Sequence, residues 1–178
     1  MKLRCLITIF ITLLLSAGLL AVTKYDSYIQ EQTLLHFGDV SLWKWHKARL
    51  YVESGLNPQA YNPNDPAYGI AQFTLPTAKK YNIKSPKQLY DPYISIRIMM
   101  LYIKDIIKYV FGTMLSPKEL HDRNVQMLAD AGYNAGPGAA KRAYDLSGKV
   151  ANWQKNKKYL PEITRKYCER IQNVKERF

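Results

Sequence analysis

A glutamate followed by a serine at a predicted helix end is the part of this sequence best suited to chemistry. Glu53 and Ser54 close an apolar-rich run over residues 42–52, and a turn-forming segment, residues 55–58, follows them directly. A carboxyl group between apolar neighbours and a turn is partly withdrawn from water, which raises its pKa. The position therefore indicates a general acid, a group that donates a proton to a substrate.

The other reactive residue types exclude several kinds of site. The sequence has no Ser, His and Asp in an order with a glycine elbow, and its histidines, His36, His46 and His121, lack the spacing of metal ligands. The glycine-rich segment 132–138 has neither the lysine nor the preceding strand of a phosphate-binding loop. We therefore expect no metal and no cofactor.

Amide and phenol side chains accompany the acid in the segments expected to form loops. Gln72, Tyr133 and Asn134 are of this kind, and 12% of the chain is aromatic. Such groups hydrogen-bond and stack against sugar rings. The set around Glu53 is thus typical of a groove that binds carbohydrate.

Helix signals dominate the elements that must position these residues. Proline-rich residues 57–68 and glycine-rich residues 132–138 are expected to be irregular, and no strand pair or internal repeat is evident. The fold class is therefore predicted to be mainly α. Capping residues, first-turn prolines and helical spacing of apolar residues predict helices over residues 39–54, 75–81, 92–111, 117–131, 139–144 and 160–174.

Length and composition indicate one folded domain behind a targeting segment. The chain has 178 residues, of which 47% are hydrophobic and 22% charged, enough for a single core and too apolar for disorder. Lys2 and Arg4 precede an uncharged run over residues 5–22. Residues 1–23 are therefore predicted to be a cleaved signal peptide or a retained membrane anchor, and either places a domain of residues 24–178 outside the cytoplasm, in the periplasm or cell envelope.

Cysteine use and charge limit the partners of the domain. Cys5 lies inside the apolar run and cannot pair with Cys168, so no disulfide framework is expected. The net charge is +12, and residues 141–178 carry eleven Lys or Arg against four acidic residues. This basic part is either a solvated helix face or a surface for anionic lipid or an acidic envelope polymer, whereas export disfavours nucleic acid.

Three motifs occur in an order that resembles the soluble-type lytic transglycosylases, a family with the SLT domain in the lysozyme-like superfamily and similar to glycoside hydrolase family 23. The resemblance covers about residues 40–170. Residues 89–92 and 164–167 are similar to two further landmarks of the family. The motifs are Glu53-Ser54 with Asn57-Pro58, Gly69-Ile70-Ala71-Gln72 with Pro76-Thr77-Ala78, and Ala131-Gly132-Tyr133-Asn134-Ala135-Gly136-Pro137-Gly138.

The resemblance implies a lysozyme-like helical fold with a substrate cleft and an activity on peptidoglycan glycan strands. Glu53 would protonate the β-1,4 bond between N-acetylmuramic acid and N-acetylglucosamine, and its carboxylate would then deprotonate the muramyl 6-hydroxyl. The product is a 1,6-anhydromuramyl end. No water is consumed, so a second carboxylate is not required.

Supporting roles follow from the same resemblance. Tyr167 would hydrogen-bond Glu53, while Gln72, Tyr133 and Asn134 would bind the N-acetyl or lactyl groups of the substrate. Ser54 would steady the reacting sugar or the acid. Single-domain exported members of this kind serve secretion systems, pili or phage entry, so such an envelope-spanning apparatus is a further expected partner.

Departures from the family pattern leave alternatives open. The usual Leu-Met of the family is Ile70-Ala71 in this chain, the usual alanine is Gly132, and the usual asparagine is Ser95. The segment after Glu53 is about one residue longer than in the family and contains Asp65. If Asp65 reached the cleft, it could position a water for an inverting, goose-type lysozyme-like hydrolysis. A non-catalytic wall-binding component of a secretion or phage apparatus is the other alternative.

Overall fold

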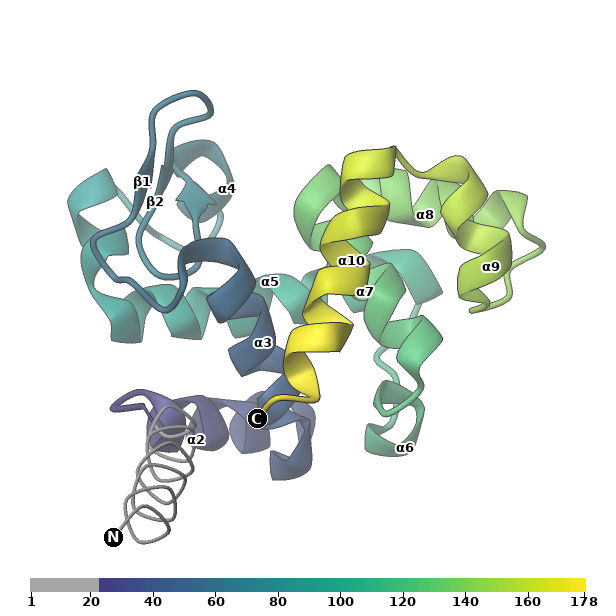
Figure 1. Cartoon of the computed structure of the whole chain (residues 1–178), viewed down its shortest axis with the longest axis horizontal. Helices are drawn as coiled ribbons and strands as arrows, with labels where there is room; N and C mark the ends of the chain where they lie inside the picture. Colours follow the sequence, from purple (N-terminus) through teal and green to yellow (C-terminus); the bar gives the residue numbers. More distant parts are fainter. Residues whose placement is uncertain (1–22) are drawn as a thin grey trace, which may run out of the picture.

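A computed structural model describes residues 23–178, which form a mainly helical domain, as the sequence predicts (Figure 1). The predicted signal peptide or anchor over residues 1–23 lies, except for residue 23, outside the described residues and stays a prediction. Within residues 23–178, no helix is long and apolar enough to cross a membrane. In chain order the elements are α2 (Asp26–Phe37), η1 (Val40–Leu42), α3 (Trp43–Ser54), β1 (Tyr61–Asn62), β2 (Ala67–Tyr68), β3 (Phe73–Thr74), α4 (Leu75–Lys79), η2 (Pro86–Tyr90), α5 (Pro92–Phe111), α6 (Pro117–Leu120), α7 (Arg123–Ala135), α8 (Pro137–Leu146), α9 (Trp153–Asn156), η3 (Lys157–Tyr159) and α10 (Glu162–Lys175).

The long helix α5 runs along the domain and contacts α2, α7 and α8 (Figure 1). The side chain of Asp91 caps its first turn by accepting hydrogen bonds from two backbone N–H groups, and Gly112 ends it with a left-handed φ of 79°. The bounds match the predicted 92–111. Its buried isoleucines include Ile103 and Ile106, and each contributes about 1.5–3 kcal/mol to the stability of the core.

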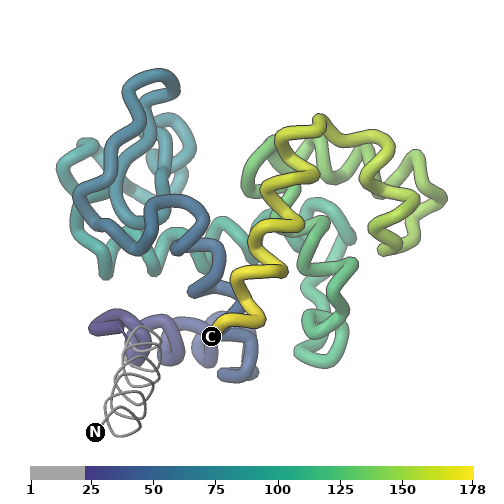
Figure 2. Tube along the Cα trace, viewed as in Figure 1, coloured from purple at the N-terminus to yellow at the C-terminus, as the bar shows by residue number. Residues whose placement is uncertain are grey.

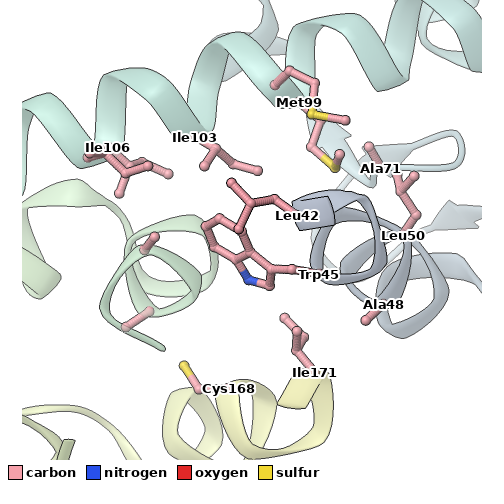
Figure 3. Close-up of a cluster of buried hydrophobic side chains, with 14 of the residues drawn as sticks. Leu42, Trp45, Ala48, Leu50, Ala71, Met99, Ile103, Ile106, Cys168 and Ile171 are labelled. Atoms are coloured by element: carbon pink, nitrogen blue, oxygen red, sulfur yellow. The ribbon is translucent and has the colours of Figure 1, made fainter. Parts of the chain in front are cut away.

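Helix α3 packs against α10 and α2. Trp45 of α3 is buried among side chains of α5 and α10, including Ile103 and Ile171 (Figure 3). Asp39 caps the 3₁₀ turn before α3, and Gly55 ends the helix with a φ of 64°. The predicted single helix from residue 39 is therefore a short 3₁₀ turn followed by an α-helix.

Both ends of the described chain return to α3. The carboxylate of Asp26, at the start of α2, pairs with the buried Lys47 ammonium at 2.8 Å. The same ammonium lies 4.3 Å from the centroid of the Phe178 ring, which brings the C-terminal end beside α3 (Figure 2). Helix α2 itself went unpredicted because its buried face includes polar side chains, Asp26, Gln32 and Thr33.

A three-stranded antiparallel sheet replaces the irregular segment predicted at residues 57–68. Strand β2 pairs with β1 through Tyr61 opposite Tyr68, and with β3 through Tyr68 opposite Phe73. Each strand is two residues long, too short for an alternating apolar pattern to show. The prediction that no strands pair was therefore wrong, and the β1–β2 connection is a prominent projecting loop (Figure 1).

Helix α7 continues through the segment that was predicted to be a loop. Gly132, Tyr133 and Asn134 are its last turn, and the chain leaves the helix only at Gly136. Glycine is needed at 132 because a Cβ there would lie 2.5 Å from Cγ2 of Ile106 on α5. The glycine therefore marks a close approach between two helices and not a break in one.

The region around α7 departs from the prediction in two other bounds. The predicted helix 117–131 is divided at His121 and Asp122, and the Asp122 side chain caps α7 by accepting from the Asn124 backbone. Helix α8 starts at Pro137, two residues before the predicted 139–144, since proline suits a first helical turn. The final helix α10 agrees with the predicted 160–174 to within two residues.

Candidate active site

A cleft of about 280 Å³ opens beside the end of α3. It brings together four of the predicted site residues, Glu53, Gln72, Tyr133 and Asn134, and it is also lined by Asp65. The remaining two predicted residues, Ser54 and Tyr167, are outside its lining. The other lining residues come from the sheet, α4 and α5: Asn62, Ala67, Phe73, Thr74, Thr77 and Tyr102.

Glu53 lies in the last turn of α3, half-buried, with its carboxyl group facing the cleft. The phenol of Tyr167 on α10 donates a hydrogen bond to Glu53 Oε1. Burial raises the pKa of Glu53 from 4.5 to about 7, and the Tyr167 hydrogen bond and the Arg49 charge partly oppose this rise. Because one oxygen accepts from Tyr167, the other can carry the proton that a general acid requires.

Gln72 connects the sheet to the loop before it. Its amide group donates to the carbonyl oxygens of Gly69 at 2.9 Å and Ala60 at 3.3 Å. The backbone at Gln72 has a left-handed φ of 50°, which is uncommon for a residue with a side chain. The hydrogen bonds hold the Gln72 side chain at the cleft wall, with its amide oxygen left to accept from a ligand.

Tyr133 and Asn134 line the cleft from the last turn of α7. The Tyr133 phenol donates to the Ala71 carbonyl oxygen at 2.7 Å and so ties α7 to the segment that carries Gln72. Asn134 Oδ1 accepts from the Thr164 hydroxyl of α10 at 2.8 Å. Its amide N–H groups have no partner within residues 23–178 and can donate to a ligand in the cleft.

Residues 43–156 match the sequence profile of the family described as Transglycosylase SLT domain. The chain belongs to this family. A comparison with curated proteins gives no match. Membership of this family supports the conclusion that the protein is a peptidoglycan-acting enzyme of the lytic transglycosylase type.

Two serines of the SLT domain lie beside the cleft and not in its lining. Ser54 donates its hydroxyl to the Ile70 carbonyl oxygen at 2.7 Å, so it joins α3 to the segment before β3 without lining the cleft. Ser95 is fully buried in α5, and a Cβ on Gly69 would lie 3.6 Å from its hydroxyl. Ser54 therefore holds the backbone beside the cleft, whereas the buried Ser95 hydroxyl has no hydrogen-bond partner within residues 23–178.

Asp65 lies in the connection between β1 and β2, where its side chain is exposed and lines the cleft. The structure therefore places a second carboxyl group, besides that of Glu53, among the residues that line the cleft. A carboxylate there could order a water or accept a hydrogen bond from a sugar hydroxyl or amide.

Sequence reasoning missed a charged pair beneath this cleft. Arg49 of α3 and Asp130 of α7 are both fully buried and form an ion pair. Two signals could have indicated it: Arg49 precedes Glu53 by four residues, and Asp130 interrupts an apolar stretch of α7. Tyr102 was also missed as a lining residue because its position on α5 fits an ordinary core stripe.

Replacing Tyr167 with phenylalanine is expected to raise the pKa of Glu53 further, because the phenol stabilises the ionised carboxylate. The pH above which activity falls should move upward. The rate should drop about 10- to 100-fold, since a hydrogen bond to a charged group contributes about 1.5–3 kcal/mol. A pH profile of peptidoglycan digestion measures both effects. The exposed Tyr109→Phe is the control, and an unmoved profile for Tyr167→Phe would contradict this role.

Proposed function

We propose that the cleft cleaves the β-1,4 bond between N-acetylmuramic acid and N-acetylglucosamine without water and leaves a 1,6-anhydromuramyl end. The observation that carries this proposal is the state of Glu53, a half-buried carboxyl group in the cleft with a pKa raised to about 7 and one oxygen held by Tyr167. A carboxylic acid with this pKa is protonated in a useful fraction of molecules at neutral pH.

In the first step Glu53 donates its proton to the glycosidic oxygen. The bond between this oxygen and the muramyl anomeric carbon breaks, the N-acetylglucosamine leaves with a new hydroxyl, and positive charge develops on the muramyl ring. The carboxylate formed on Glu53 then lies beside that charge. Tyr167 steadies the carboxylate because its phenol continues to donate to Oε1.

In the second step the Glu53 carboxylate accepts the proton of the muramyl 6-hydroxyl. The freed oxygen bonds to the anomeric carbon and closes the anhydro ring, and Glu53 is protonated again for the next cycle. Proton and bonds balance without water or a second carboxylate. A single carboxylic acid with a pKa near 7 suits both directions of proton transfer.

Substrate binding is assigned to the polar groups that the cleft leaves available. The Asn134 amide N–H groups and the Gln72 amide oxygen are placed to hydrogen-bond the N-acetyl or lactyl groups of the glycan. Tyr102 and Tyr133 offer aromatic surface in the same cleft. Ser54 contributes indirectly through its hydrogen bond to the Ile70 backbone.

The position of Asp65 in the cleft lining favours one second candidate, hydrolysis by an inverting mechanism. In that reaction Asp65 would deprotonate a water that attacks the anomeric carbon, while Glu53 acts only as the acid. A reducing end would form. The two reactions therefore differ in their products and in their need for Asp65.

Digestion of purified peptidoglycan, read by mass spectrometry, separates these reactions. We expect products with anhydro ends, each lighter than the corresponding reducing end by the mass of one water. Asp65→Asn should retain the same products, with a rate within about tenfold of the parent. Reducing ends alone, lost in Asp65→Asn, would instead establish the hydrolase, and glycan binding with no product would support the non-catalytic component.

A further inference from the structure

Arg49 lies one helical turn before Glu53 on α3, at the four-residue spacing that allows an arginine and a glutamate to form an ion pair. Within residues 23–178, however, Glu53 is hydrogen-bonded by Tyr167 and has no ion pair with Arg49. Such a pair would hold Glu53 ionised and remove the proton that the acid must donate. The domain therefore contains a cation next to its acid that must be kept from pairing with it.

Asp130 of α7 occupies the guanidinium group. Arg49 Nε donates to Asp130 Oδ1 at 3.1 Å, and Arg49 Nη2 donates to the same oxygen. Trp45 Nε1 also donates to Asp130, at 3.1 Å to Oδ1 and 3.2 Å to Oδ2. Every one of these donors is an N–H group, which is the arrangement that an ionised carboxylate accepts.

The remaining guanidinium nitrogen is also engaged. Arg49 Nη1 donates to His46 Nδ1 at 3.2 Å, so the His46 ring accepts at Nδ1 and carries its proton on Nε2. The guanidinium carbon lies 4.6 Å from the Trp45 ring centroid and 5.5 Å from that of Tyr133. Because all three nitrogens have partners and two rings pack against the plane, the guanidinium is fixed behind the cleft wall.

We propose that Asp130 is a positioning residue that holds the Arg49 guanidinium away from Glu53, so that the Glu53 carboxyl group can carry the proton it donates. The inference rests on the proposed function of Glu53 as the acid. In this inference the buried ion pair affects the reaction through Glu53, and neither Arg49 nor Asp130 contacts the substrate. Replacement of buried ion pairs by apolar residues is often neutral or stabilising, so stability alone does not account for such a pair.

The groups that face Glu53 give the sign of the effect. On its own helix Arg49 lowers the pKa of Glu53, whereas Asp130 on α7 raises it. Tyr167 on α10 lowers it by donating a hydrogen bond. The other titratable groups of the cleft are Tyr133 on α7, Tyr102 on α5 and Asp65 between β1 and β2.

Asp130→Asn removes the charge while keeping a side chain of the same shape. We expect the pKa of Glu53 to fall by about one unit or more, because the Arg49 charge is no longer balanced and its hold is weaker. The upper pH limit of digestion should fall by the same amount. Glu53 is titrated by NMR of its side-chain carboxyl carbon in the full chain, and digestion is followed across the same pH range.

The double variant Arg49→Met/Asp130→Asn is the matched control. Removing the cation as well should return the pKa of Glu53 and the pH limit of digestion to the parent values or above. If Asp130 served only the packing of α7, the second substitution would restore neither. Recovery of the Glu53 pKa when the second buried charge is removed therefore distinguishes a positioning role of Asp130 from a purely structural one. Failure to recover it would overturn the inference.

A third variant covers the case in which Asp130→Asn does not fold. Arg49→Met/Asp130→Leu replaces the pair by apolar side chains, and we expect it to fold with a Glu53 pKa no lower than in the parent. A lower value would overturn the inference. NMR measures the pKa of Glu53 independently of catalysis, so an unchanged titration in a folded Asp130→Asn variant would contradict this inference alone. An active Glu53→Gln variant would contradict the proposed function.

Discussion

Replacing Glu53 with glutamine is expected to reduce glycan cleavage by the SLT domain by roughly 10²- to 10⁴-fold or more, because glutamine can neither donate nor accept the transferred proton. The amide keeps the shape of the side chain and can still accept the hydrogen bond from Tyr167. The variant should therefore bind glycan strands normally. Release of soluble muropeptides, with a sedimentation assay for binding, measures the two properties separately.

The same variant should be more stable than the parent above pH 7. The folded-state pKa of Glu53 is raised from 4.5 to about 7, so the folded protein binds this proton more tightly than the unfolded chain. That contribution to stability is fully present below pH 4.5 and is lost as the pH rises through 7. Above pH 7 the glutamine variant should gain up to roughly 3 kcal/mol in free energy of unfolding, since one pKa unit corresponds to about 1.4 kcal/mol.

Urea unfolding at pH 4 and pH 8 measures this difference. Glu31→Gln is the control, because Glu31 is exposed on α2 and should show no comparable gain. Activity equal to the parent would remove Glu53 from the reaction. A glutamine variant that lost stability at pH 8 would show instead that the carboxylate is held by favourable interactions and is not destabilised by burial.

Replacing Gly69 with alanine is expected to have the largest effect on stability. A Cβ at this position would lie 1.8 Å from the carbonyl oxygen of Leu89 and 2.8 Å from its carbonyl carbon, and the residue has a left-handed φ of 76°. Backbone atoms cannot move aside as the end of a side chain can, so the loop or η2 must shift. We expect a loss of several kcal/mol, beyond the roughly 1–2 kcal/mol of the left-handed conformation alone.

Gly112→Ala separates the two contributions. Gly112 ends α5 with a nearly equal φ of 79°, but nothing lies within 4 Å of an added Cβ. Chemical unfolding of both variants should therefore show a cost of about 1–2 kcal/mol at 112 and a clearly larger one at 69. Equal costs would mean that the segment between β2 and β3 yields easily and does not hold Gln72 rigidly.

Local sequence signals predicted several of the elements that carry the cleft residues. Asp91, Pro92 and Gly112 define both ends of α5, and apolar residues repeat along its length, so its bounds were predicted correctly. The sequence motifs likewise predicted that Glu53, Gln72 and Asn134 share one cleft, and all three line it. These features are encoded in short stretches of chain, whose local structure does not depend on contacts with distant residues.

Features that depend on distant partners were not predictable in the same way. The glycine at 132 was read as a helix break because its reason, the side chain of Ile106, is on another helix. The strands near 61 and 67 are too short to leave a pattern. The Arg49–Asp130 pair joins two helices, so neither residue alone shows that its charge is neutralised.

The hydrogen bond between Tyr167 and Glu53 joins residues that are 114 positions apart in the chain. Tyr167 belongs to α10, the last helix, which docks on α3 and α7. A growing or truncated chain that lacks α10 therefore carries the acid without the group that orients it. The site is therefore complete only when the last helix has docked, and we expect a chain without α10 to cleave glycan less efficiently than the whole domain.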